Sequence, residues 1–164
     1  MQVSPKIGWQ VAPLDFDVFD ELYDLRTLIE CHAAQLLAEA EARPTLAALA
    51  EVWLLPEAER LSDSAEVGRL DEQFHAQLVQ GSGNREMARV HRSITERIRI
   101  IRRLDFTKTA RVAATYDEHA RILGAITRRR ADEAQRLLRA HIAQSKTEVR
   151  HITLDMLYRA RRQA

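Results

Sequence analysis

Apolar residues recur every three or four positions along almost the whole chain of 164 residues. This spacing places them on one side of an α-helix, whereas a half-buried strand would require strict alternation. Only five glycines and four prolines interrupt the pattern, and most of them fall where one helical stretch gives way to the next. The sequence therefore predicts an all-α fold, an antiparallel bundle with short connections.

Six helical stretches are predicted. The first three are 15–40, 45–55 and 64–81, with Pro44 as an early residue of the second. The fourth begins at a cap, Asn84, and the fifth covers 108–128 with a break near Thr115. The sixth runs from a cap at Asp132 to about 161. The predicted core stripe of the first helix is Val18, Leu22, Leu25, Ile29, Ala33, Leu36 and Ala40. Only residues 7–12 alternate in the manner of a strand.

The charge balance and the cysteine count exclude several classes of protein. Lysine and arginine number 25 and the acidic residues 24, so the net charge of +1 argues against a protein that coats nucleic acid. The basic runs 97–103 and 128–130 are interpreted as solvated helix faces. One cysteine, Cys31, allows no internal disulfide and favours a reducing compartment. Without an apolar run of ~20 residues, we expect a soluble, cytoplasmic protein with no membrane segment.

Four polar residues fall in the middle of otherwise apolar stripes. Asp71 and His75 are four positions apart and leave the same face of one helix, while His119 and His141 lie centrally on two others. A buried aspartate is costly unless it is paired or bound to a cation. Three imidazoles and one carboxylate from three helices would hold a divalent metal, and these ligand types suit zinc, nickel, manganese or iron.

The same pattern also has simpler interpretations. A histidine on an apolar stripe is often a hydrogen-bonded core residue, and Asp71 with His75 could be an ordinary pair one helical turn apart. His32 and His91 also lie on or beside apolar stripes. Periodicity alone therefore does not select the ligands.

Four ordered motifs carry a resemblance to a known family. Residues 70–75, L-D-E-Q-F-H, followed by G-S-G-N at 81–84, resemble the "D-x-x-F-H … S-G-N" signature of the FCD domain, the C-terminal ligand-sensing half of FadR-like GntR regulators. Residues 118–126, E-H-A-R-I-L-G-A-I, resemble the family's Glu-His helix, and His141 matches the histidine of its final helix. Residues 22–34 resemble the opening "L-x-x-x-R-x-x-L/I-E-x-x-A-A". The resemblance spans roughly 19–145.

The resemblance implies a bundle of six or seven helices, and we expect the domain to form a homodimer. In metal-containing members of the family, an aspartate and three histidines bind one divalent ion, zinc being the first expectation here. These ligands correspond to Asp71, His75, His119 and His141. Other members lack the metal and bind acyl thioesters, but the presence of all four ligand types favours the metal-containing kind.

Effectors of similar domains are mostly small carboxylates, which implies a small acid as the partner of this chain. An arginine fork matches a carboxylate in shape and charge. Arg26, on the edge of the first helix's apolar face, is the main candidate to bind the acid, although it could be a surface arginine with a buried stem. Arg102 and His91 are further candidates for lining the cavity.

The family's winged helix-turn-helix is missing from this chain. Residues 1–14 resemble a remnant of the last strand of the wing and its linker, which leaves 15–162 as the effector-binding domain, either excised or naturally truncated. We therefore expect contact with DNA only through the absent domain.

Two other functions remain open at this point. A mononuclear metalloenzyme would need a general base near the metal, but Glu118 points about 100° away from His119 around the helix. No HExxH pair is present. A helical interaction module would need no metal at all. The enzyme is the weaker alternative to the sensor.

Overall fold

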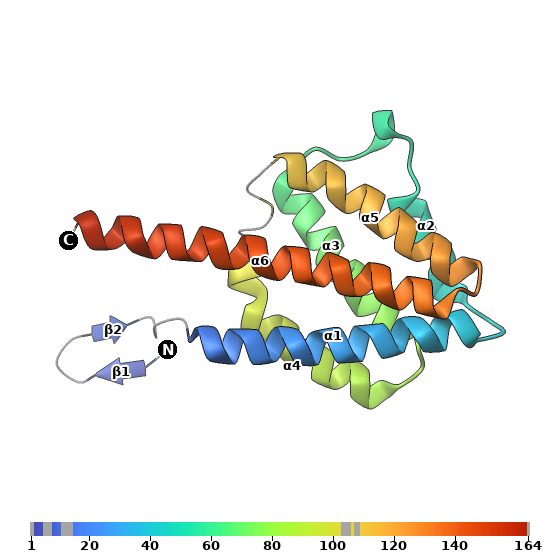
Figure 1. Ribbon diagram of the computed structural model, residues 1–164, viewed down its shortest axis with the longest axis horizontal. Helices are drawn as coiled ribbons and strands as arrows, with labels where there is room; N and C mark the ends of the chain where they lie inside the picture. The colour runs from blue at the N-terminus through green and yellow to red at the C-terminus, as the bar shows by residue number, and fades with distance from the viewer. Residues whose placement is uncertain (1, 5–7, 11–14, 103–105, 107–108, 164) are drawn as a thin grey trace.

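The computed structural model describes residues 2–4, 8–10, 15–102, 106 and 109–163. Over these residues the chain forms six α-helices, one short 3-10 helix and a two-stranded antiparallel ribbon (Figure 1). The elements are β1 (Gln2–Ser4), β2 (Gly8–Gln10), α1 (Phe16–Glu39), α2 (Pro44–Trp53), η1 (Glu57–Glu59), α3 (Ser64–Gly81), α4 (Arg85–Arg102), α5 (Thr109–Thr127) and α6 (Ala131–Gln163). The predicted all-α class is confirmed.

The two longest helices, α1 and α6, run side by side in opposite directions along the length of the molecule (Figure 1). Ion pairs join them, with Arg150 Nη1 2.6 Å from Asp20 Oδ2 and Lys146 Nζ 3.1 Å from Asp24 Oδ1. Helix α5 packs antiparallel to α6, and α3 contacts α1, α4 and α5 from the inside of the bundle. Polar side chains on the inner faces of α3, α5 and α6 are therefore directed toward one another.

The helix starts follow local capping chemistry. The Asp15 side chain accepts hydrogen bonds from the backbone nitrogens of Asp17 and Val18, at 3.0 and 3.2 Å, before α1. The Asn84 side chain accepts from the backbone nitrogen of Met87 at 3.0 Å, as the predicted cap of α4 requires. Pro44 is the first residue of α2, where its missing N–H costs nothing.

Two local predictions were wrong. Helix α5 has no break at Thr115, because the Thr115 hydroxyl donates to the Arg111 carbonyl at 2.9 Å and is satisfied within the helix. Helix α6 begins at Ala131, so Asp132 lies in the first turn instead of capping it. The predicted strand is present over its described residues, Gly8–Gln10, and it pairs with β1, which the pattern did not indicate. Residues 7, 11, 12, 103 and 108, which bounded predicted segments, lie outside the described residues.

The buried face of α1 differs from the predicted stripe. Leu25 is 42% exposed, whereas Arg26 and Glu30 are 1% and 0% exposed and lie among buried apolar side chains. The prediction failed because it counted only apolar residues and so rotated the stripe away from this polar pair. On α3, α5 and α6 the four candidate ligands are buried, as their position in apolar stripes predicted.

Other expectations concern the surface and the chain as a whole. Arg128, Arg129 and Arg130 are exposed, as a solvated face requires, but Arg102 of the other basic run is buried. Cys31 is a free, buried cysteine. Among the described residues, no helix combines the length and the apolar character that crossing a membrane demands.

Candidate metal centre

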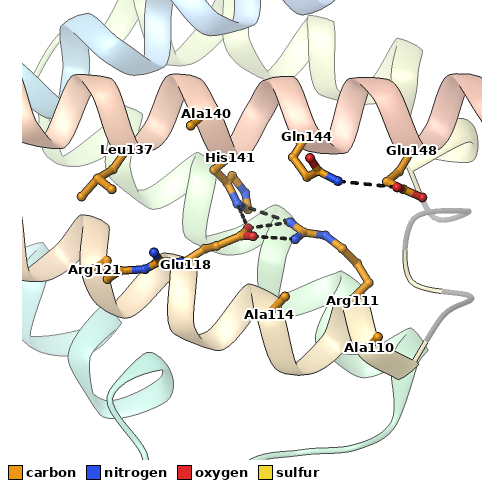
Figure 2. Close-up of a pocket in the computed structure, with 10 residues that line it drawn as sticks. All are labelled: Ala110, Arg111, Ala114, Glu118, Arg121, Leu137, Ala140, His141, Gln144 and Glu148. Carbon is orange, nitrogen blue, oxygen red and sulfur yellow. Dashed lines mark hydrogen bonds and ion pairs between the residues drawn. The ribbon is translucent and has the colours of Figure 1, made fainter.

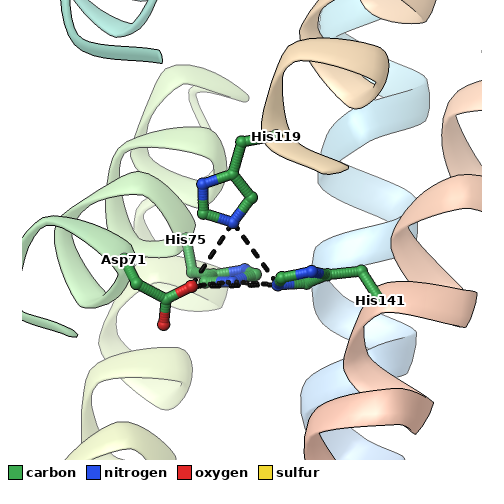
Figure 3. Close-up of side chains that lie close together, drawn as sticks. All are labelled: Asp71, His75, His119 and His141. Atoms are coloured by element: carbon green, nitrogen blue, oxygen red, sulfur yellow. Dashed lines mark hydrogen bonds and ion pairs between the residues drawn. The ribbon is translucent and has the colours of Figure 1, made fainter. Parts of the chain in front are cut away.

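Asp71, His75, His119 and His141 meet at one point inside the bundle (Figure 3). Helix α3 supplies the first two, α5 the third and α6 the fourth, and none of the four is more than 4% exposed. One ligand atom from each residue lies within 4.8 Å of all the others. The bundle therefore places four metal-ligand side chains from three helices around a common centre.

The separations between these atoms fit coordination of one ion. Oδ1 of Asp71 lies 3.3 Å from His119 Nε2, 3.5 Å from His75 Nε2 and 3.8 Å from His141 Nε2. The Nε2 atom of His141 lies 3.1 Å from that of His75 and 3.4 Å from that of His119. Ligands about 2.1 Å from a metal lie about 3.4 Å apart in a tetrahedron and about 3.0 Å apart at neighbouring octahedral positions. The donor set and its spacing both fit a divalent ion.

Two carboxylates, the buried Glu30 and the partly buried Glu118, orient two of the imidazole rings. The Nδ1–H of His75 donates to Glu30 Oε2 at 2.5 Å, and that of His141 donates to Glu118 Oε2 at 2.6 Å. A proton on Nδ1 leaves a lone pair on Nε2 of the same ring, directed at the centre. Carboxylates behind ligand histidines fix the ring orientation and raise the basicity of the ligand nitrogen.

His119 is held by packing. Its ring stacks on Phe74 with centroids 3.7 Å apart and planes 9° apart, and the Trp53 ring meets it edge-on at 4.1 Å. Among the described residues, its Nδ1 has no hydrogen-bond partner. The orientation of this ring therefore depends on its aromatic neighbours.

Two buried ion pairs surround the cluster. Arg102 Nη2 donates to Asp71 Oδ2 at 2.5 Å, on the oxygen that faces away from the histidines. Glu30 Oε1 accepts from Arg26 Nε at 2.6 Å and from His91 Nε2 at 2.8 Å. The three residues proposed from the sequence to contact an effector, Arg26, Arg102 and His91, thus all lie beside the cluster.

These surroundings set the protonation of the cluster. Burial alone raises the pKa of Asp71, but Arg102 and His75 outweigh it and hold that pKa well below its usual range. Burial lowers the pKa of His119 far below its ordinary value, and it also lowers the pKa of His141. A charged Asp71 carboxylate with neutral His119 and His141 rings is a state suited to binding a metal.

A cleft of about 460 Å³ lies between α5 and α6 and reaches His141 from the outside (Figure 2). Arg111 donates to both oxygens of Glu118, at 2.9 and 2.8 Å, and its Nη2 lies 3.3 Å from His141 Nδ1. Burial raises the pKa of Glu118, but hydrogen bonds from His141 and Arg111 lower it to about 2. Arg26, Arg102 and His91 do not line this cleft.

The sequence did not assign a role to Glu30, Glu118 or Arg111. Arg26 and Glu30 are four positions apart on one face of α1. This spacing is the signal in the sequence that the two side chains pair with each other. Glu118 was set aside because it diverges from His119, and that divergence is what lets it reach His141 on α6.

The structure is an all-α bundle in which three histidines and an aspartate lie around one buried point, a set of residues that could hold a metal ion. The chain belongs to the FCD domain family, the effector-sensing domain of GntR-type transcription regulators, and the family's model matches residues 21–144. The family resemblance predicted from the sequence is confirmed.

Two relatives are named as transcriptional regulators. The Nta operon transcriptional regulator of Aminobacter aminovorans is 30% identical over 135 residues, which cover 82% of this chain and 63% of that protein. The uncharacterized HTH-type transcriptional regulator YdhC of Bacillus subtilis (strain 168) is 24% identical over 156 residues, which cover 93% of this chain and 69% of that protein. The chain thus spans about two thirds of the length of these relatives.

Proposed function

We propose that this domain binds one divalent metal through Asp71, His75, His119 and His141, and a small carboxylate effector beside it. The observation that carries the proposal is the convergence of three imidazole nitrogens and a carboxylate oxygen on one dry point. Two Nε2 lone pairs 3.1 Å apart, next to a charged carboxylate, are unfavourable unless a cation lies between them. We propose zinc as the metal; nickel, manganese and iron suit the same ligands.

The residues around the cluster suit an acid. A divalent ion at this point supplies positive charge and coordination positions for an acid oxygen. Arg26 pairs with Glu30 and Arg102 pairs with Asp71, and His91 also contacts Glu30. Arginine forks pair with carboxylates in two parallel hydrogen bonds, which gives orientation as well as charge.

We further propose that the effector acts on DNA-binding domains at the N-terminal end of a homodimer in the cytoplasm. Helix α1 carries Arg26 and Glu30 and begins at Phe16, directly after the N-terminal segment. A shift of α1 on effector binding would therefore move whatever precedes it. Residues 1–14 would be the end of a wing and its linker, and 15–162 the sensor; the pairing of β1 with β2 supports a wing remnant. The size of the effect is limited by the difference in effector affinity between the two arrangements.

A metalloenzyme fits the contacts less well. A general base would have to face the metal's open side. Glu118 instead accepts hydrogen bonds from His141 and Arg111, and Glu30 is engaged by Arg26, His75 and His91. Both carboxylates therefore orient histidine rings and pair with arginines. Both relatives are named as regulators, which supports a role in sensing.

Elemental analysis of the purified chain, before and after zinc loading, tests the metal. We expect about one divalent ion per chain, and its loss with retained helical circular dichroism when His75→Ala and His119→Ala are combined. A matched double change at His32 and His151, which are exposed, should leave the metal content unchanged. Differential scanning fluorimetry of the loaded chain against small organic acids tests the effector. A helical chain that holds no metal after loading would refute the proposal.

A further inference from the structure

Two buried polar groups near the cluster have donors that nothing described in the structure accepts. Arg26 is 1% exposed and Thr95 is 4% exposed. Among the described residues, Nη1 and Nη2 of Arg26 and Oγ1 of Thr95 have no hydrogen-bond partner. A buried polar atom without a partner costs free energy, so such atoms are rare unless a ligand or an ordered water accepts from them.

The packing of α1 against α4 brings these groups together. The two helices run in opposite directions (Figure 1), and the hydrogen bond from His91 Nε2 to Glu30 Oε1 at 2.8 Å fixes their register. Thr95 is one turn after His91 on α4, and Arg26 is one turn before Glu30 on α1. Because the helices are antiparallel, one turn forward on α4 and one turn back on α1 are displacements in the same direction. Thr95 therefore lies at about the same height along the helix pair as Arg26.

The Arg26 guanidinium is held through its Nε atom, among the described residues. Nε donates to Glu30 Oε1 at 2.6 Å, and Cζ lies 5.6 Å from the centroid of the Tyr23 ring. The two terminal nitrogens therefore remain as a fork of donors. Burial alone lowers the pKa of Arg26, but the Glu30 and Asp71 carboxylates raise it above its ordinary value, which places the fork within electrostatic reach of the cluster.

The charges around the cluster balance before any metal binds. Three buried or half-buried ion pairs each join one arginine to one carboxylate. They are Arg26 with Glu30 at 2.6 Å, Arg102 with Asp71 at 2.5 Å and Arg111 with Glu118 at 2.8 Å. A divalent ion held by neutral imidazoles therefore adds two positive charges with no counterpart. In a dry interior such an excess is costly, and a ligand with two negative charges removes it.

We propose that the effector is a small dicarboxylic acid whose second carboxylate is held by the Arg26 fork and the Thr95 hydroxyl. The inference rests on the proposed function, since the first carboxylate occupies the same metal-dependent acid site. A monocarboxylic acid of equal length compensates only one charge and leaves the Arg26 and Thr95 donors without an acceptor. Thr95 is then a specificity-determining residue that separates diacids from monoacids.

Isothermal titration of the zinc-loaded chain with matched acids tests the proposal. The probes are succinate against butyrate and malate against 2-hydroxybutyrate, which differ only in the second carboxylate. We expect each diacid to bind at least tenfold more tightly than its partner. Thr95→Val should weaken diacid binding about tenfold and leave monoacid binding unchanged. Thr27→Val is the matched control, because the Thr27 hydroxyl already donates to the Tyr23 carbonyl at 2.8 Å.

A second measurement separates ligand binding from a purely structural role of Thr95. Thr95→Val replaces an unpartnered hydroxyl by a methyl group of the same shape, so the melting temperature of the metal-free variant should rise by about 2–4 °C. Equal affinity for diacid and monoacid, or equal effects of Thr95→Val and Thr27→Val on succinate, would overturn the inference and leave a metal-dependent acid sensor standing. If the zinc-loaded chain binds none of the four acids, both the diacid inference and the proposal of a carboxylate effector are refuted.

Discussion

The Nε2 atoms of His75 and His141 lie 3.1 Å apart in the centre of the bundle, and each ring has its Nδ1–H directed at a carboxylate. With the ring proton on Nδ1, neither Nε2 atom can donate a hydrogen bond to the other. The negatively charged Asp71 Oδ1 lies 3.5 Å from His75 Nε2 and 3.8 Å from His141 Nε2. The folded state holds these groups together at a cost in free energy, which a divalent cation bound between them would remove.

Chelation should therefore lower the stability of the domain. A ligand at a hundred times its dissociation constant stabilises a fold by about 2.7 kcal/mol, so we expect zinc to raise the melting temperature of an EDTA-treated sample by about 5–10 °C. Differential scanning fluorimetry with a zinc titration measures this shift. His141→Ala should abolish the shift, whereas His32→Ala, at an exposed position, should keep it. Identical melting curves with and without zinc would contradict a structural contribution of the metal.

The carboxylates behind the histidines are expected to tune metal affinity. Glu118→Gln keeps an acceptor for the His141 Nδ1–H but removes its charge, so zinc affinity should fall about tenfold. Competition with a fluorescent chelator measures the change. Asp117→Asn provides the matched control, because this neighbouring carboxylate pairs with Arg60 at 2.9 Å and is 62% exposed. An equal loss in both variants would mean that the effect is general electrostatics and that Glu118 does not position His141.

The sequence predicted the inner faces of α3, α5 and α6 because the candidate ligands there lie in stripes of apolar residues at helical spacing. The prediction failed on α1, whose inner face carries Arg26 and Glu30. A search for apolar stripes assigns charged residues to the surface, even where they form a buried ion pair. Periodicity also could not separate His91 from the ligands. His91 is as buried as they are, and only its distance to Glu30 shows that it supports the cluster from outside.

Aromatic packing should matter most for His119, because its ring has no hydrogen bond at Nδ1 among the described residues. Phe74→Leu removes the stacked ring 3.7 Å from His119 while it keeps most of the apolar volume. We expect the free energy of unfolding to fall by about 1–2 kcal/mol and zinc affinity to fall several-fold. Urea denaturation of the metal-free chain and chelator competition measure the two effects. Leu28→Ala, at a 63% exposed side chain, should change neither.

Cys31 should react slowly in the folded domain. The side chain is 3% exposed, and burial raises the pKa of its thiol above the ordinary value, so little thiolate forms near neutral pH. Labelling with a disulfide reagent at pH 8 should be at least ~100-fold slower in the native chain than in urea. The native rate should also increase with pH, because the thiolate is the reactive form. A native rate close to the denatured one would show that α1 opens readily around residue 31.

The turn between α5 and α6 offers a stabilising substitution. Arg129 has a φ of 58°, in the left-handed region that side chains other than glycine adopt at a cost. Its neighbours complete the turn, with Arg130 N donating to Ala125 O at 3.0 Å and Arg129 N to Ile126 O at 3.0 Å. Arg129→Gly removes the strain and gives up only a 3.4 Å surface hydrogen bond to Glu39 O. We expect the free energy of unfolding to rise by about 0.5–1 kcal/mol, measured in urea. Arg128→Gly, where φ is not positive, should lower it, and equal effects of the two changes would show that the turn holds no such strain.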